Sequence, residues 1–203
     1  MKDWLVPGGI EDYVGQGKDV WYVTSNTAVA SSNLYKTDLT TGEGGKLIQD
    51  ARRYPLDQVE ADTGGSMFVM ISQRNKTEWS NKIFRWNPQQ TPYELTANFV
   101  SNTLPFSYSI KALNGKLLIA RNDLSGGHSE LDKPLSLLDL KTHQQVHLTW
   151  EHRPIALDHT ADEFVALAED GMLAFIRPEA SEKPDRELEV PGLQSGKWIA
   201  VKK

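Results

Sequence analysis

The chain has no cysteine and no long apolar run, and these absences exclude several kinds of site. Without cysteine it can form no disulfide, no thiolate nucleophile and no zinc–thiolate centre. Its longest apolar stretches have about six residues, whereas a membrane-spanning helix needs about 20. The first residues also lack the apolar core of a signal peptide. We therefore expect a soluble domain that does not insert into a membrane; if the domain is excised, its targeting segment lies outside it.

Familiar catalytic and cofactor-binding motifs are equally absent. There is no Gly-x-Ser-x-Gly nucleophile turn and no Asp-x-Asp-x-Asp-Gly calcium loop. The glycine-rich stretch "TGEGG" lies between two expected strands, without the following helix that a phosphate-binding loop needs. The sequence therefore predicts neither a metal nor a cofactor.

Charge and length restrict the class of protein further. A net charge of −5 is unlike that of a dedicated nucleic-acid binder. At 203 residues, the chain is short enough to form one all-β domain over residues 1–203. No window longer than about ten residues keeps a helical period of 3.6, so a helical bundle is the weakest interpretation.

What the sequence does contain is a repeated series of short alternating apolar runs. Four runs rich in aromatic and β-branched residues predict strands at 19–25, 66–72, 116–122 and 163–169. Each is followed by a second run, such as "NLYKTDLTTG", and then by a third, such as "GKLIQD". A further short run precedes three of these units, at 57–62, 107–113 and 154–159. The pattern predicts about four strands per unit.

The spacing of the units indicates their architecture. Aligning the second runs places Asp38, Asn87, Asp139 and Arg177 in one column, at separations of 49 (38 to 87), 52 (87 to 139) and 38 (139 to 177) residues. Periods of about 40 to 50 residues with several strands each are typical of a β-propeller. We therefore predict an all-β fold, a small β-propeller of about four to five four-stranded blades.

Turn residues support the same hairpins. In "DLTTG", Asp38 is expected to accept hydrogen bonds from the backbone of its own turn, and Gly42 to supply a positive φ. In the second and fourth units Pro88 and Pro178 stand near this point, where a proline would end a strand.

Two arrangements of the ends stay open. "GLQSGKWIAVKK" from Gly192 reads as two strands of a further blade, to which "MKDWLVPGG" could add a strand. The ring would then close by pairing of the N- and C-terminal segments in a fifth blade. Alternatively, the chain is part of a larger propeller and exposes a sheet edge.

The outer hairpins carry a resemblance to a known family. "LYKTDLTTGEGGKLI", "IFRWNPQQTPYELT" and "LSLLDLKTHQQVHLT" resemble TolB-like and WD40-like β-propeller repeats over roughly residues 18–190. The Pro-Asp-Gly turn of that family is matched only loosely, and no Gly-His and Trp-Asp pair occurs. The resemblance implies protein–protein recognition in the bacterial cell envelope, or an extracytoplasmic domain of a membrane-bound regulator.

Histidines and paired acids are the remaining candidates for chemistry. His143 and His147 would share one strand face about 13 Å apart, too far to chelate one ion. His152 and His159 could meet a ligand only from another blade. Acids near the expected first strands, Asp57, Asp62 and Asp158, could serve a propeller-type hydrolase, such as a glycosidase or lactonase, with or without a metal. As strand-end and turn residues, they have a simpler interpretation.

One group of loop residues stands out once blades are assumed. Loops from an outermost strand to the next blade, and loops from a second strand to a third, emerge at the same rim. This rim would gather Arg52, Arg53, Tyr54, Arg74, Lys76, Trp79, Arg121, His128, His152 and Arg153. Arginine and aromatic residues are enriched at binding hot spots. The alternative is that these are solvated loop residues, with a few arginines bonding neighbouring blades.

Two functions follow. The first is a non-catalytic binding or sensory module whose rim recognises a protein partner or a small anionic ligand. The second is the hydrolase, with its acids at the central channel. Because no catalytic motif is present, we favour the binding module and expect no nucleic-acid partner.

Overall fold

The computed structural model describes residues 9–26, 31–48, 56–62, 66–75, 78–87, 90–101, 108–121, 134–192 and 199–200. Every regular element in these ranges is a β-strand. Across the same ranges no helix has the length and hydropathy that a membrane span requires.

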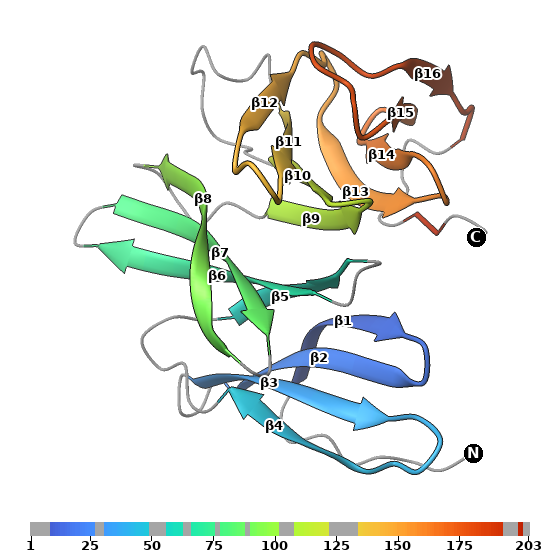
Figure 1. Cartoon of the computed structure of the whole chain (residues 1–203). Coiled ribbons are helices and arrows are strands. Elements are labelled where there is room, and N and C mark those ends of the chain that lie inside the picture. Colours follow the sequence, from blue (N-terminus) through green and yellow to red (C-terminus); the bar gives the residue numbers. More distant parts are fainter. Residues whose placement is uncertain are drawn as a thin grey trace. The chain divides into compact units, whose positions relative to one another are not determined.

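The described strands form four sheets, and each sheet is an antiparallel meander of four consecutive strands (Figure 1). The first sheet contains β1 (Gly9–Gln16), β2 (Asp19–Asn26), β3 (Ser31–Asp38) and β4 (Gly44–Ile48). The second contains β5 (Leu56–Ala61), β6 (Met67–Asn75), β7 (Glu78–Asn87) and β8 (Gln90–Ser101). The third contains β9 (Tyr108–Leu113), β10 (Lys116–Arg121), β11 (Leu135–Asp139) and β12 (Gln145–Leu148). The fourth contains β13 (Pro154–His159), β14 (Phe164–Ala168), β15 (Met172–Ile176) and β16 (Arg186–Glu189).

These sheets confirm the repeat that the sequence predicts. The strands β3, β7 and β11 end at the aligned residues Asp38, Asn87 and Asp139, and β15 ends one residue before Arg177. The short runs ahead of three units form β5, β9 and β13. Each unit is therefore one four-stranded blade.

The sequence interpretation misses the first strand of the first sheet. The strand β1 has the sequence "GIEDYVGQ", with two glycines and two acids, and most of its residues are exposed. It lacks the apolar alternation that marks the other strands, although it pairs with β2 in regular register apart from a bulge between Ile10 and Asp12. Of the two end segments considered for ring closure, only residues 9, 192, 199 and 200 are described, so the predicted closure lies outside the described residues.

The second sheet also corrects the sequence analysis. The predicted rim residues Arg74, Lys76 and Trp79 are expected in a loop between a second and a third strand, but β6 and β7 continue pairing as far as Asn75 and Glu78. Only residues 76–77 separate the two strands. The outermost strand β8 contains Pro92, which is tolerated because an edge strand needs no N–H there for a neighbour.

The chain divides into two compact units, and the first contains Met1–Ala61 and Gly65–Leu104. In this unit β5 lies against β1 and β2. An apolar cluster of Trp21, Val23, Leu34, Val59, Met67 and Val69 joins the first and second sheets. The Asp12 carboxylate accepts a hydrogen bond from the backbone N–H of Val59, with an O–N distance of 2.9 Å. Burial of these side chains stabilises the pairing of the two sheets.

The second unit contains Asp62–Gly64 and Pro105–Lys203. Here β13 lies against β9 and β10. Alternate residues of the third and fourth sheets form one apolar cluster, which includes Leu118, Leu135, Trp150, Phe164 and Ala166. The period of two along each strand places these side chains on the facing surfaces of the two sheets.

Candidate functional site

The crossover from the third sheet to the fourth belongs to the expected rim. Residues 149–153 leave the end of β12 and lead into β13. Because Pro154 pairs with Ala168, the crossover enters the fourth sheet at the edge where β14 ends. The turn between β14 and β15 lies at this same edge, so the two loops meet as predicted.

Two side chains of the crossover bind acids of that turn. The Nδ1 atom of His152 lies 2.6 Å from Oδ2 of Asp170. The Nη1 atom of Arg153 donates to Oε2 of Glu169 at 3.2 Å, and the backbone N–H of Glu169 donates to the Arg153 carbonyl at 2.9 Å. Two of the predicted rim residues are thus held in defined positions by acids that the sequence analysis did not include.

Beneath these pairs the crossover is anchored in the apolar core. Trp150 is 2% exposed, and its ring lies 5.4 Å from the His152 ring in a tilted arrangement. On the other side, Nε2 of His152 lies 3.9 Å from Oε2 of Glu187 on β16. The imidazole therefore lies between two carboxylates and above a buried indole.

The surroundings of Asp170 favour its ionised form. Burial raises the pKa of Asp170, but hydrogen bonds from His152 and from the Met172 N–H outweigh burial, so the pKa is lowered overall. The neighbouring acids Glu169 and Glu187 are 63% and 43% exposed. This part of the rim consequently carries both signs of charge.

Two buried donors of the crossover lack an acceptor among the described residues. They are Nε1 of Trp150 and Nη2 of Arg153. A buried donor without an acceptor costs about 1–3 kcal/mol, and such groups are often satisfied by water or by a ligand. Arg153 therefore uses Nη1 within the fold, and its Nη2 is buried without an acceptor among the described residues.

Three other predicted rim residues, Arg74, Trp79 and Arg121, belong to described strands. Arg121 ends β10, at the end of the third sheet from which the crossover leaves. Arg74 and Trp79 are Cα partners within the β6–β7 ladder. The predicted residues outside the described ranges are Arg52, Arg53, Tyr54, Lys76 and His128.

The remaining histidines occupy structural positions. His143 lies on the β11–β12 turn with a φ of 60°, so its expected place on a strand beside His147 is wrong. The ring of His147 lies 2.8 Å from the Ser136 hydroxyl, and Nδ1 of the buried His159 lies 2.7 Å from the Thr160 carbonyl. Within the described ranges, no cluster of three or more His, Asp or Glu residues could hold a metal ion.

The acids considered for hydrolysis are spread over different elements. Asp57 belongs to β5 and Asp158 to β13. The Asp62 carboxylate, at 3.4 Å, accepts a hydrogen bond from the Gly115 N–H in the β9–β10 turn. This contact gives Asp62 a structural role in the turn of the third sheet.

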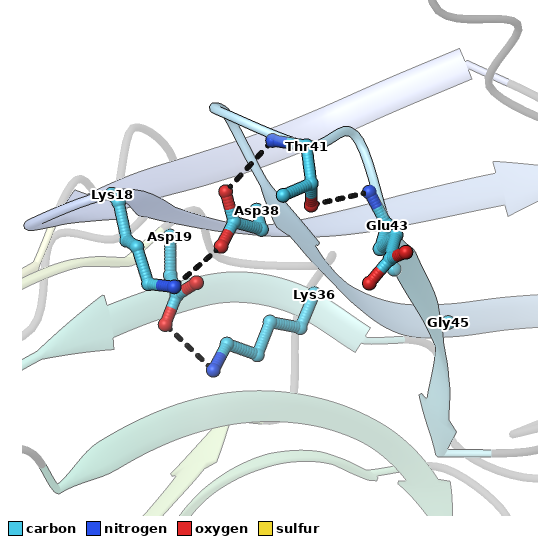
Figure 2. Close-up of a pocket in the computed structure, with 8 residues that line it drawn as sticks. Lys18, Asp19, Lys36, Asp38, Thr41, Glu43 and Gly45 are labelled. Atoms are coloured by element: carbon cyan, nitrogen blue, oxygen red, sulfur yellow. Dashed lines mark hydrogen bonds and ion pairs between the residues drawn. The ribbon is translucent and has the colours of Figure 1, made fainter.

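A polar hollow of about 480 Å³ lies on the first sheet, beside the β1–β2 and β3–β4 turns (Figure 2). Figure 2 shows two ion pairs along it: Lys18 with Asp38 at 2.7 Å, and Lys36 with Asp19 at 2.6 Å. Lys36 also lies over the Trp21 ring, 5.1 Å from its centroid. Four of the five charged side chains that line the hollow are therefore paired with one another.

The hollow is built by the turn that the sequence predicts. Oδ1 of Asp38 accepts hydrogen bonds from the N–H groups of Thr40 and Thr41, and Gly42 has a φ of 74°. Hydrogen bonds from Lys18 and from the two backbone N–H groups lower the pKa of Asp38 to about 2. The hydrogen bond to Asp38 also raises the pKa of Lys18.

The same arrangement recurs at the β11–β12 turn. Asp139 accepts hydrogen bonds from the N–H groups of Lys141 and Thr142 and pairs with Lys116 at 2.7 Å. In the fourth sheet Arg177 takes the aligned position and binds Asp185, with an Nε–Oδ1 distance of 2.8 Å. Since this turn recurs in the third sheet, we assign the Asp38 turn a role in the repeat, and the rim crossover remains the candidate site.

Comparison with known proteins supports the fold. No protein-family model matches the chain, and no curated protein matches it in sequence. A propeller chain from the crystal structure of the mitotic checkpoint complex has 11% identity and a TM-score of 0.53, over 84% of this chain and 48% of that one.

Two further solved structures are similar at lower TM-scores. Apo AztD from Citrobacter koseri has 15% identity and a TM-score of 0.48, over 94% of this chain and 51% of that chain. The computationally designed Ika8 protein has 11% identity and a TM-score of 0.46, over 89% and 61%.

The chain thus spans about half to three-fifths of the length of these structures. Since no family model matches, the TolB-like lineage stays a prediction. The four meander sheets and the similarity to the checkpoint-complex chain together show that this chain has a β-propeller fold.

Proposed function

We propose that the chain is a non-catalytic binding module, a β-propeller that recognises a protein partner through its rim. The observation that carries the proposal is the ordering of His152 and Arg153 on the crossover, where Asp170 and Glu169 hold their side chains. The Arg153 side chain is 31% exposed, so a carbonyl or carboxylate oxygen of a partner could accept a hydrogen bond from its exposed part.

The geometry of the crossover suits such a role. Its backbone is tied to the β14–β15 turn, and Trp150 anchors it in the core. A side chain that is already ordered loses less conformational entropy when a partner binds. Arginine and aromatic residues at the rim are also the types that dominate binding energy at interfaces.

The charge of the rim favours a protein over a small anion. Glu169, Asp170 and Glu187 stand beside His152 and Arg153, so a free anion would meet repulsion as well as attraction. A protein surface can place opposite charges against each of these groups. Recognition of a small anionic ligand is the second form of the proposal.

We also propose that the module acts in the bacterial cell envelope. This placement rests on the resemblance of the outer hairpins to TolB-like repeats, which implies an extracytoplasmic sensory or scaffolding domain. Fold similarity does not decide location.

The test is a comparative capture experiment from lysate. The rim variant carries Arg53→Glu and Arg153→Glu, two arginines of the predicted rim; Arg74 is left unchanged because it lies within β6. The matched control carries Lys141→Glu and Lys183→Glu, two exposed lysines outside the rim loops, with the same change in charge. We expect wild type and control to capture the same partner and the rim variant to lose it. Equal capture by all three folded proteins would contradict the proposal.

A further inference from the structure

His152 lies where three elements at one edge of the fourth sheet meet. It belongs to the crossover, and its ring pairs with an acid of the β14–β15 turn and an acid of β16. The Nδ1 atom lies 2.6 Å from Oδ2 of Asp170, and Nε2 lies 3.9 Å from Oε2 of Glu187. Histidine is the side chain whose charge ordinarily changes between about pH 5 and about pH 8. The crossover therefore holds a titratable group between two other elements.

The neutral ring can bond only one of the two acids. Burial raises the pKa of Asp170, but the hydrogen bonds from His152 and from the Met172 N–H lower it overall, so its carboxylate is ionised and accepts from Nδ1–H. Nε2 of the neutral ring then carries a lone pair, which is an acceptor like the Glu187 carboxylate. The distance of 3.9 Å between Nε2 and Oε2 is too long for a hydrogen bond. Glu187 thus lies beside the ring without being bonded to it.

Protonation changes the contact with Glu187. Nε2 of the imidazolium carries a proton, so the ring becomes a donor at both nitrogens. Glu187 needs to approach by about 1 Å to accept a hydrogen bond from Nε2. The side chains of His152 and Glu187 are 23% and 43% exposed, so solvent reaches the ring and Glu187 has room to move. The charged ring can therefore bond both acids.

Trp150 and Arg153 are the neighbours of the ring along the crossover. Trp150 is uncharged, and its ring lies 5.4 Å from the imidazole. Arg153 is a cation, but Nη1 of its guanidinium is bound by Glu169 at 3.2 Å. Among the described residues, the two acids named above are the charged side chains that pair with the ring. The imidazolium would therefore lie between two carboxylates.

Glu187 links this ring to the outermost strand of the fourth sheet (Figure 1). Among the described strands β16 pairs only with β15, and all four of its residues are exposed. Glu187 is the register partner of Ala174, whose side chain lies in the core between the third and fourth sheets. Glu187 therefore projects from the face of β16 that is turned toward that core and the crossover. A bond from His152 would hold β16 from a second direction.

We propose that His152 is a pH-dependent clamp that fastens β16 to the crossover. When protonated, it bonds Asp170 and Glu187 together; when neutral, it bonds Asp170 alone. The edge of the fourth sheet is then held more firmly at about pH 5.5 than at about pH 8. The clamp is a property of this chain by itself, whereas any effect on partner binding rests on the proposed function. The test therefore uses the protein without a partner, so that the two proposals can fail separately.

The test measures hydrogen exchange of the β16 amides that bond to β15, at about pH 5.5 and about pH 8. Each protection factor corrects for the intrinsic pH dependence of exchange and is divided by that of the β14 amides in the same sample. Glu187→Gln removes the carboxylate and keeps the length of the side chain, and His152→Gln removes the titrating ring. Glu189→Gln is the matched control, since Glu189 is exposed and lies on the same face of β16 as Glu187. Carboxylates ordinarily remain ionised throughout this pH range.

We expect the relative protection of β16 to be about two- to fivefold higher at the lower pH in wild type and in Glu189→Gln, the effect of one exposed ion pair. The difference should disappear in Glu187→Gln and in His152→Gln. Because the ratio is taken within each protein, a change in overall stability does not obscure it. Equal protection at both pH values in wild type would overturn the proposal. So would a difference that persists in Glu187→Gln or in His152→Gln, or one that Glu189→Gln also abolishes.

Discussion

The aspartate that ends a third strand stabilises its blade at the scale of one residue. Asp38 and Asp139 each accept two backbone hydrogen bonds from their turn and pair with a lysine of the neighbouring strand or turn. These contacts lower the pKa of Asp38 to about 2, and the hydrogen bonds from Lys116 and from the turn lower the pKa of Asp139. These contacts explain why the aligned position holds an aspartate in the first and the third sheet.

A pH dependence follows from these two carboxylates. Their folded-state pKa values lie below the unfolded value of about 3.9, so they stabilise the fold above that pH and lose this effect as the pH falls through their folded values. The double variant Asp38→Asn and Asp139→Asn cannot titrate at either position. We expect its urea-unfolding midpoint to fall less than that of wild type between about pH 5 and pH 2. Parallel pH profiles would show that the two aspartates contribute nothing.

His143 offers a second test at this scale. It adopts a φ of 60° at the place in its turn where Gly42 has 74°. A Cβ in the left-handed region costs about 1–2 kcal/mol, and the greater entropy of an unfolded glycine offsets about half of that. We expect His143→Gly to be about 0.5–1 kcal/mol more stable than His143→Ala in chemical denaturation. Equal stability would mean that the turn relaxes around the alanine.

At the scale of the element, the contact between two sheets depends on small residues. Ala166 of β14 and Ala174 of β15 are fully buried in the cluster between the third and fourth sheets. Larger side chains there would force the sheets apart. The alanines therefore set how closely the sheets approach.

We expect Ala166→Leu to lower the free energy of unfolding by about 1–3 kcal/mol, as overpacking does in other cores. Val146→Leu, at an exposed position of β12, is the control and should change stability by less than about 0.5 kcal/mol. Thermal and urea unfolding of both variants measure the difference. An Ala166→Leu variant as stable as wild type would mean that the two sheets are not closely packed.

Elements differ in how far the sequence predicts them. Strands buried on both faces, such as β10 and β14, are continuous apolar runs, and their turns contain Asp, Asn or Gly. The strand β1 was missed because an exposed edge strand needs little apolar alternation. The pairing beyond Gln73 in the β6–β7 hairpin was missed because this stretch is polar and lacks apolar alternation. The hydrogen bonds that hold it join backbone atoms, which do not depend on the type of side chain.

At the scale of the whole molecule, the sequence predicts that loops meet at a rim, but not which charges surround them. Arg153 and His152 were predicted from loop composition. Their partners Glu169 and Asp170 lie in the next hairpin, and only the pairing of β13 with β14 brings them near. Contacts of the crossover with the next hairpin depend on how β13 and β14 pair, so the order of residues in the sequence does not predict them.

The affinity for the captured partner tests the central claim, that the propeller binds through its rim, most directly. Titration calorimetry would compare wild type, Arg153→Glu and Lys141→Glu with the same purified partner. The account predicts that Arg153→Glu weakens binding at least about tenfold, the effect of about 1.4 kcal/mol, and that Lys141→Glu does not. Equal dissociation constants for wild type and Arg153→Glu would contradict it.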